Sequence, residues 1–194
     1  DLKLGSTEYA YVDGTFQIEL PVGEMYAEVS KGFEFDPQRV KLSIEPGQRE
    51  LEISLGRIAD LRAEGWVTAD SHTHFLTPDT AWLEGQAEGL NLINLLASQW
   101  GDLYTNFGDI TGRSSGASRD DTVVWVGTEN RQHFLGHISM LGVQGAPVLP
   151  MCTSGPTEGY FGDPTWRAMS EWADECREKG GVVVVPHFPF PYSE

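Results

Sequence analysis

Two histidines separated by one residue are the strongest sign of chemistry in this sequence. His72 and His74 lie within residues 70–74, at the end of a short apolar segment that begins at Trp66. In an extended segment, residues two apart project to the same side, so both imidazoles can face one cation while Asp70 or a main-chain group orients one of them. Imidazole together with carboxylate suits zinc, manganese or iron. The segment predicts a divalent-metal site, although such a pair also occurs by chance.

Glu129 occupies a matching position after a second apolar segment. It follows residues 123–127, which have the composition of a strand, by two positions. The carboxyl ends of strands form the edge at which open α/β and barrel enzymes assemble their sites. A carboxylate there can bridge two metal ions or hold a water, so Glu129 is predicted to belong to the same site. The alternative is a solvated turn residue.

Two further histidines stand at the ends of predicted strands. His137 follows Gly136 at the start of an apolar stretch, and His187 follows the valine-rich residues 182–185 and a proline. Each of them alone could be a buried structural histidine. Four of the five histidines share this placement, which favours one common site, whereas His133 lacks it and is predicted to be a bystander.

The first part of the chain has the pattern of a small antiparallel β-domain. Short segments with alternating apolar residues are separated by turn signals such as Asp13-Gly14, which suits a tight hairpin. Strands at roughly ten-residue spacing without helical periodicity are typical of a sandwich. The expected strands are residues 9–12, 16–20, 25–29, 40–44 and 51–55. We therefore expect an antiparallel β-sandwich domain over residues 1–64.

Beyond residue 64 the pattern changes to that of an α/β protein. The continuous apolar character of residues 122–127 is typical of a parallel sheet covered on both faces. The expected strands are residues 66–70, 90–96, 122–127 and 182–185, and the expected helices are residues 80–89 and 163–179. Residues 101–121 lack periodicity, and a loop of that length is usually an active-site loop or a lid. The expected fold class is thus α/β plus β.

The N-terminal pattern resembles a known type of module. Residues 14–26 have the pattern G-x-F-x-I-x-L-P-x-G-x-M-Y and precede the step Lys31-Gly32-Phe33. This pattern is similar to carboxypeptidase regulatory-like, prealbumin-type modules, which are found attached to secreted enzymes. The resemblance implies a secreted or periplasmic protein.

The order of motifs in residues 65–194 resembles a metallohydrolase family. The HxH pair is followed by an Asp five positions later, a strand ending in Gly-x-Glu, a Gly-His step and a strand ending in Pro-His. This order is similar to that of the polymerase-and-histidinol-phosphatase (PHP) superfamily, and the Gly65-Trp66 lead-in looks most like its CehA/McbA-type members. The resemblance implies a distorted (β/α) barrel with two or three metal ions, and we expect one to three zinc, manganese or iron ions here.

The resemblance also implies roles for individual residues. The implied metal ligands are His72, His74, Asp79, Glu129, His137 and His187. Glu129 is implied as the bridge between metal ions, and Asp70 or Asp79 is expected to move protons. The expected catalytic residues are therefore Asp70, Asp79 and Glu129.

Two features depart from the family pattern. Family members carry a Thr-Asp-His step after the second strand, where this sequence has Ser98-Gln99-Trp100, so a Trp stands where a metal-binding His is expected. They also carry an Asp-x-His motif on a late strand, which this sequence lacks after its last predicted strand. Because a (β/α) barrel needs roughly 250 residues, we expect residues 65–194 to be its N-terminal part. The site would then be completed by a further segment or by another chain, or it would be incomplete.

The charge balance excludes some partners. The chain has 29 acidic and 13 basic residues and a formal net charge of −16, and such a surface repels a phosphate backbone. No stretch approaches the roughly 18 consecutive apolar residues of a membrane span. We expect a small-molecule substrate, no nucleic-acid partner and no membrane insertion. Whether Cys152 and Cys176 pair is open.

The expected function is that of a divalent-metal-dependent hydrolase. A metal-activated water would attack a small phosphoester, ester or carbamate. One alternative is a non-catalytic carbohydrate- or protein-binding module with a degenerate metal site, and another is an adhesion module without a ligand. Aromatic residues could line an apolar or sugar-stacking cleft, with core packing the default for Trp125. These residues are Trp82, Trp100, Trp125, Tyr104 and Phe107.

Overall fold

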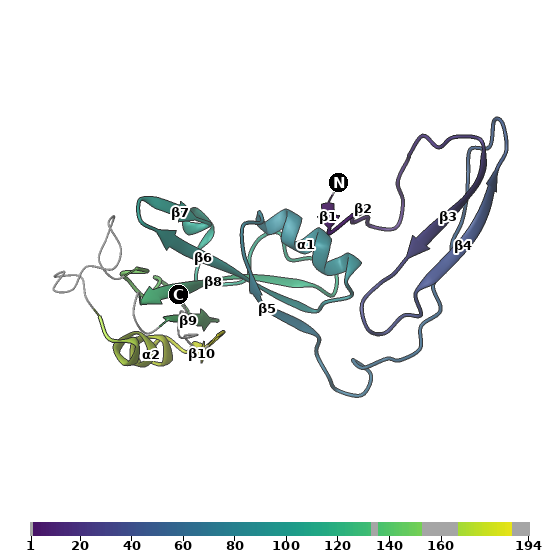
Figure 1. Cartoon of the computed structure of the whole chain (residues 1–194). Coiled ribbons are helices and arrows are strands. Elements are labelled where there is room, and N and C mark those ends of the chain that lie inside the picture. The colour runs from purple at the N-terminus through teal and green to yellow at the C-terminus, as the bar shows by residue number, and fades with distance from the viewer. Residues whose placement is uncertain (1, 133–135, 153–166, 188–194) are drawn as a thin grey trace. The chain divides into compact units, whose positions relative to one another are not determined.

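The chain is mixed α/β and divides into two compact units (Figure 1). The structure is a computed structural model that describes residues 2–132, 136–152 and 167–187. One unit comprises Asp1–Thr68 and Leu83–Asn91, and the other comprises Ala69–Trp82 and Leu92–Glu194. The boundary expected after residue 64 lies close to Thr68, but Leu83–Asn91 groups with the first unit.

Antiparallel strand pairs form the sheets of the first unit. The strands are β1 (Leu2–Leu4), which pairs with β2 (Thr7–Tyr9), and β3 (Gly23–Val29), which pairs with β4 (Gln38–Ile44). In the β3–β4 pair, Met25 lies opposite Leu42, and Leu42 is buried. Burial alternates along both strands because the pleat sends successive side chains to opposite faces. The strands expected at residues 25–29 and 40–44 are confirmed.

Three other expected strands of this unit do not form as predicted. Residues 10–20 and 51–55 have no strand assignment, so the hairpin expected across Asp13-Gly14 is not formed. Phe16 and Ile18 are 64% and 62% exposed. An alternating apolar pattern becomes a strand only where a neighbouring strand pairs with it and another layer covers its apolar face. The unit shows two antiparallel pairs, and the complete sandwich remains a prediction.

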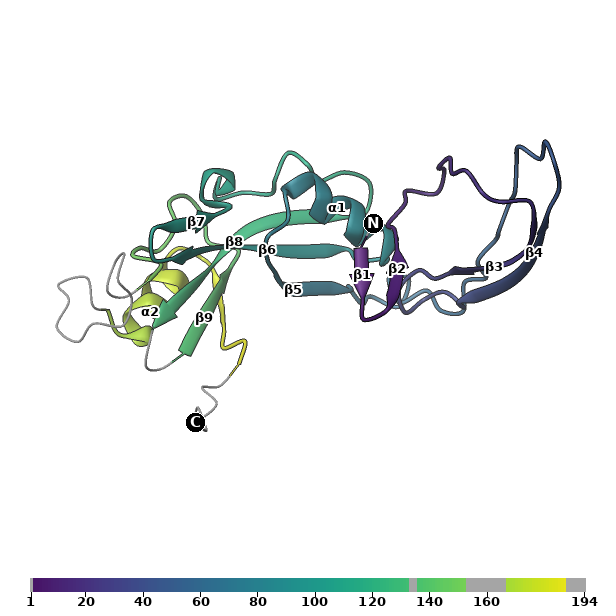
Figure 2. The same ribbon diagram turned by 45° about the horizontal axis from the view of Figure 1, so that its top comes forward.

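The second unit is built on a six-stranded mixed sheet that curls into a half-barrel (Figure 2). Its strands are β5 (Ala69–Thr73), β6 (Leu92–Trp100), β7 (Leu103–Thr105), β8 (Val123–Gln132), β9 (Gly136–Leu141) and β10 (Val182–Val184). The strand order is β10-β9-β8-β6-β5, and β7 pairs with the far end of β6. The strands β5, β6 and β8 are parallel, whereas β9 and β10 continue the sheet in antiparallel fashion.

The length of each connection explains these directions. The helix α1 (Pro78–Ala87) carries the chain from β5 to β6, and β7 and a 3-10 turn (Phe107–Asp109) lie between β6 and β8. Parallel neighbours need a connection of about a dozen residues or more. Only residues 133–135 separate β8 from β9, so these strands must pair as a hairpin. The sheet is therefore mixed, whereas the apolar pattern of residues 122–127 predicted a parallel one.

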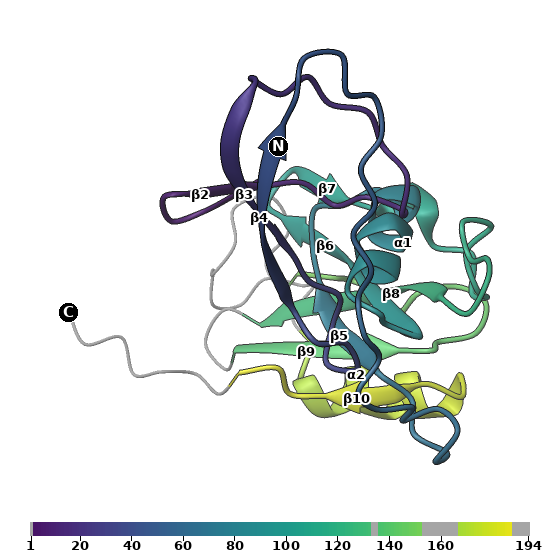
Figure 3. The ribbon, with the colours of Figure 1, turned by 90° about the vertical axis from the view of Figure 1, so that its right-hand side faces the viewer.

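Helix α2 (Met169–Glu178) covers β9 and β10 on one side (Figure 3). The core between them includes Ile138 and Met140 of β9 and Trp172 and Cys176 of α2, all of them buried. Gly181 follows the helix, and a Cβ there would lie 2.7 Å from the Cys176 sulfur, so only glycine fits. The expected helix end is thereby confirmed, while its expected beginning and Trp166 lie outside the described residues.

The structure also bears on the two cysteines and on membrane insertion. Cys152 and Cys176 are both buried free thiols, so they do not pair, and burial raises the pKa of Cys176. Within the part of the chain that the structure describes, no helix is long and apolar enough to cross a membrane.

Candidate metal centre

A buried carboxylate lies at the middle of the curled sheet. Glu129 belongs to β8, between β6 and β9, and pairs with Ser98 on one side and Ser139 on the other. Its side chain is only 2% exposed. An ionised carboxylate is costly to bury unless charged or hydrogen-bonded partners surround it. The partners of Glu129 therefore decide what this site can do.

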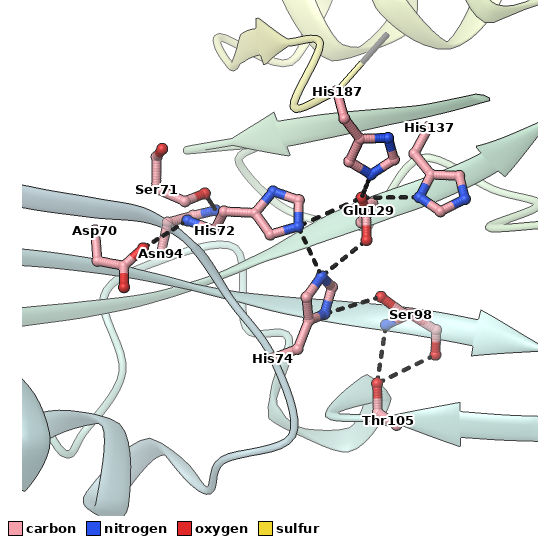
Figure 4. A network of polar contacts seen from close by, with 10 residues as sticks. All are labelled: Asp70, Ser71, His72, His74, Asn94, Ser98, Thr105, Glu129, His137 and His187. Carbon is pink, nitrogen blue, oxygen red and sulfur yellow. Dashed lines mark hydrogen bonds and ion pairs between the residues drawn. The ribbon is translucent and has the colours of Figure 1, made fainter. Parts of the chain in front are cut away.

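Four histidines converge on Glu129 (Figure 4). The Nε2 atom of His74 lies 2.8 Å from Oε2. Three nitrogens surround Oε1: His137 Nδ1 at 3.1 Å, His187 Nε2 at 3.5 Å and His72 Nε2 at 3.6 Å. Such convergence of imidazole nitrogens on one carboxylate is typical of metal sites.

The cluster contains two groups with metal-ligand spacing that share one residue. His72, His74 and Glu129 form one group, and Glu129, His137 and His187 form the other. Within each group the ligand atoms all lie within 4.8 Å of one another. These are the groups of this kind among the described residues. The five residues could therefore hold a metal ion, as the sequence predicted for each of them.

The strand β5 delivers the HxH pair to the site. It spans Ala69–Thr73 rather than residues 66–70, so His72 lies within the strand and His74 follows it. The pairing of β5 with β6 shifts register between Asp70 and Thr73. Asp70 Oδ1 accepts a hydrogen bond from the main-chain N–H of His72 at 2.9 Å. Asp70 thus holds the backbone of the pair, whereas the sequence suggested that it would orient an imidazole or move protons.

Ser98 contacts the other side of the His74 ring, and it was not identified from the sequence. Ser98 Oγ lies 3.4 Å from His74 Nδ1 and is fully buried (Figure 4). Thr105 of β7 fixes this serine, since its hydroxyl accepts the Ser98 N–H at 3.2 Å and donates to the Ser98 carbonyl at 3.5 Å. Ser98 could be found from sequence only by pairing β6 with β8, which places it beside Glu129.

The electrostatics of the cluster favour an anionic Glu129 carboxylate beside a neutral His72 imidazole. Burial acts to raise the pKa of Glu129, but hydrogen bonds from His137 and His74 outweigh it, and the pKa lies well below its usual value. Burial is also the main cause that lowers the pKa of His72, with His74 and His187 adding to it and Glu129 opposing it. A carboxylate with neutral imidazoles is the form that binds a cation.

Asp79 is predicted as a ligand, but the structure does not bring it to the cluster. It stands in the first turn of α1 with its side chain 81% exposed, and its Oδ1 lies 3.4 Å from Arg119 Nη1. The Arg119 guanidinium carbon lies 3.3 Å from the ring centre of Trp82, and the Trp82 indole donates to the Arg119 carbonyl. Asp79 therefore pairs with the Arg119 guanidinium, which Trp82 holds in place.

Comparison of the chain with protein-family models, with curated proteins and with solved structures finds no match. The assignment of a metal centre therefore rests on the geometry of the chain's own residues. Membership of the PHP superfamily remains a prediction, and His133, the expected bystander, lies outside the described residues.

Two of the five predicted cleft aromatics line a pocket. The pocket has a volume of about 360 Å³, and its lining residues are Gln99, Tyr104, Phe107, Leu149, Pro150 and Met151. Gln99 and Tyr104 are cross-strand partners, and Gln99 points away from the face that carries Ser98 because side chains alternate along β6. The pocket and the Glu129 cluster therefore lie on opposite faces of this strand.

Proposed function

We propose that this protein is a divalent-metal-dependent hydrolase whose metal centre is the Glu129 cluster. The observation that carries the proposal is the 2% exposed Glu129 carboxylate, which two separate groups of histidines share. A carboxylate with one oxygen toward His74 and the other toward His137 and His187 suits a bridge between two cations. Zinc, manganese and iron all accept this ligand set.

The donor set fits a metal ion better than it fits a structural ion pair. The ion-pair partners of Glu129 within the described residues are histidines alone. At neutral pH the lowered pKa of His72 keeps that imidazole uncharged, so it does not compensate the buried carboxylate. His72 and His74 bring their Nε2 atoms to 3.2 Å, which places two nitrogen donors beside one position. A cation there would balance the charge of Glu129.

The chemistry of such a centre is hydrolysis. A bound divalent ion supplies a water whose pKa is lowered from 15.7 toward about 7 and polarises the bond to be cleaved. His72 and His187, with side chains 35% and 42% exposed, mark the side that solvent and substrate reach. His74 and Glu129 lie on the buried side and hold their positions through Ser98 and the sheet. We propose a small phosphoester, ester or carbamate as substrate, because a net charge of −16 disfavours a long polyanion.

The proposal also has an architectural part. The curled sheet would be the N-terminal part of a distorted (β/α) barrel of the PHP type. A β-sandwich module in the first unit would precede it in the sequence. We propose a secreted or periplasmic location because residues 14–26 resemble modules that are attached to secreted enzymes.

Two observations favour a second candidate function. Trp100 stands where the family pattern has a metal-binding His, and Asp79 pairs with Arg119. A site with fewer ligands could hold one structural ion in a carbohydrate- or protein-binding module. A closed coordination shell would favour this second function, whereas an open position favours hydrolysis.

The test of the hydrolase proposal is an assay of reconstituted protein. The chain is loaded with zinc or manganese and assayed with 4-nitrophenyl phosphate, 4-nitrophenyl acetate and a 4-nitrophenyl carbamate, beside Glu129→Gln and the surface control Glu24→Gln. We expect metal-dependent turnover that falls at least about 100-fold in Glu129→Gln, as for loss of a central electrostatic group. Metal-loaded protein that cleaves none of the three would contradict the hydrolase proposal and favour the binding module.

A further inference from the structure

An aromatic side chain in an unusual backbone conformation lies next to the metal centre. Phe75 follows His74 directly, has a φ angle of 62° and is 64% exposed. A bulky residue with a positive φ is rare, and such strain persists chiefly at functional positions. The Phe75 ring centre lies 5.5 Å from that of His74. The chain thus presents an exposed ring beside a candidate metal ligand.

A second exposed aromatic side chain continues the same surface. The Trp100 ring centre lies 6.3 Å from that of Phe75, with 40° between the ring planes, and Trp100 is 39% exposed. The guanidinium carbon of Arg131 lies 3.3 Å from the Trp100 ring centre. Arg131 is two residues beyond Glu129 on β8, so the indole is held by the strand that carries the central carboxylate. Phe75 and Trp100 together form what we call the aromatic wall.

We infer that the aromatic wall binds an aromatic group of the molecule held at the metal centre. The inference rests on the proposed function in its metal-binding part. Aromatic rings interact favourably at centre distances of about 4.5–7 Å in tilted or offset arrangements, and the Phe75 and Trp100 side chains are both partly exposed. Arg131 already stacks on Trp100 and so holds the indole in one orientation.

Trp100 contributes to this surface through its indole, which contacts both Phe75 and Arg131. The wall lies beside His74, on the metal-centre face of β6, whereas the pocket at Tyr104 lies on the other face. The wall therefore belongs to the metal site, and Tyr104 offers a matched aromatic control outside it.

The experiment compares two hydroxamic acids, one with a phenyl group and one with a methyl group beside the same chelating group. Benzohydroxamic acid and acetohydroxamic acid both chelate zinc, and their affinities for the zinc-loaded protein are measured by titration calorimetry. We expect benzohydroxamic acid to bind about tenfold more tightly. In Phe75→Gly, which keeps the positive φ without strain, and in Trp100→Leu, the ratio should fall to within about threefold. Tyr104→Leu should keep the wild-type ratio.

The outcomes separate this inference from the proposed function. Zinc content is determined first for every protein. A wild-type protein that binds no zinc would overturn both the metal centre and the aromatic-wall inference. If the zinc-loaded wild type prefers benzohydroxamic acid and the wall variants lose that preference, the inference stands even when no ester is cleaved. An equal affinity ratio in wild type and wall variants, or no binding of either probe to the zinc-loaded protein, overturns it.

Discussion

The Nε2 atom of His74 lies 2.8 Å from Oε2 of Glu129, and the Nδ1 atom of the same imidazole faces the hydroxyl of Ser98 at 3.4 Å. A histidine that binds a metal through one nitrogen needs a partner for the other, which fixes the ring and its tautomer. A hydroxyl can donate to Nδ1 before metal binding and accept from it afterwards. His74 is thus held in an orientation suited to a metal ligand.

Ser98→Ala should weaken metal binding about 10- to 100-fold, because His74 loses the partner that fixes its tautomer. Ser98→Thr, which keeps a hydroxyl, should restore most of the affinity. The matched control is Ser139→Ala, on the other side of Glu129; the buried Ser139 hydroxyl has no hydrogen-bond partner among the described residues. The measurements are zinc affinity by competition with a chelator dye and the His74 tautomer by ¹⁵N NMR. Equal affinities in Ser98→Ala and Ser139→Ala would argue against this role.

Acidification should destabilise the metal-free protein through His72. Burial lowers the folded-state pKa of His72, so below about pH 6.5 the unfolded chain binds more protons there than the folded chain does. The stability present at neutral pH is therefore lost as pH falls. We expect the urea midpoint of chelator-treated protein to drop between pH 7.5 and pH 5.5, and to drop less in His72→Gln. An identical pH dependence in the two proteins would show that His72 titrates alike in both states.

Asp79→Asn should leave metal content and metal affinity within about twofold of wild type. The structure pairs Asp79 with Arg119 at an exposed position, and exposed pairs of this kind contribute about 0–1 kcal/mol. The family pattern predicts the opposite, because it makes Asp79 a ligand. Metal content measured after dialysis therefore distinguishes the two expectations. A loss of metal in Asp79→Asn as large as that in His74→Ala would show that Asp79 moves to the metal when the metal binds.

Met140→Ala should lower the free energy of unfolding by about 2–5 kcal/mol, because Met140 of β9 is fully buried in the core that β9 forms with α2. Leu103→Ala, at a 60% exposed position in the same unit, should change it by less than about 1 kcal/mol. Denaturant unfolding followed by tryptophan fluorescence gives both values. Similar values for the two variants would mean that α2 does not pack on β9 as described.

Most residues of the Glu129 cluster could be predicted from the sequence because they stand at the ends of strands. His72, His137, His187 and Glu129 each stand in or beside a short apolar segment, and a sheet brings such segments together whatever the exact strand bounds. The strand β5 spans Ala69–Thr73 rather than the expected residues 66–70, but its end still carries His72, and His74 follows it directly. Ser98 was missed because its role depends on the pairing of β6 with β8, and pairing is a long-range property that local pattern does not determine.

Other features could not be predicted for the same physical reason. The alternation at Phe16 and Ile18 is a strand pattern, but a strand also needs a pairing partner, and the structure provides none there. The place of Asp79 depends on Arg119, which is forty positions away in the sequence. The helix end at Gly180-Gly181 was predictable because a glycine stop is a local signal.

The measurement that tests the central claim most directly is metal content by plasma mass spectrometry. The protein is purified without a metal-affinity tag and compared with the double variant His72→Ala/His74→Ala and with Tyr104→Leu as a control outside the cluster. We predict about one or two equivalents of zinc, manganese or iron in the wild type and the control, and a loss of at least one equivalent in the double variant. No bound metal in the wild type, even after incubation with excess cation, would contradict a metal centre at Glu129.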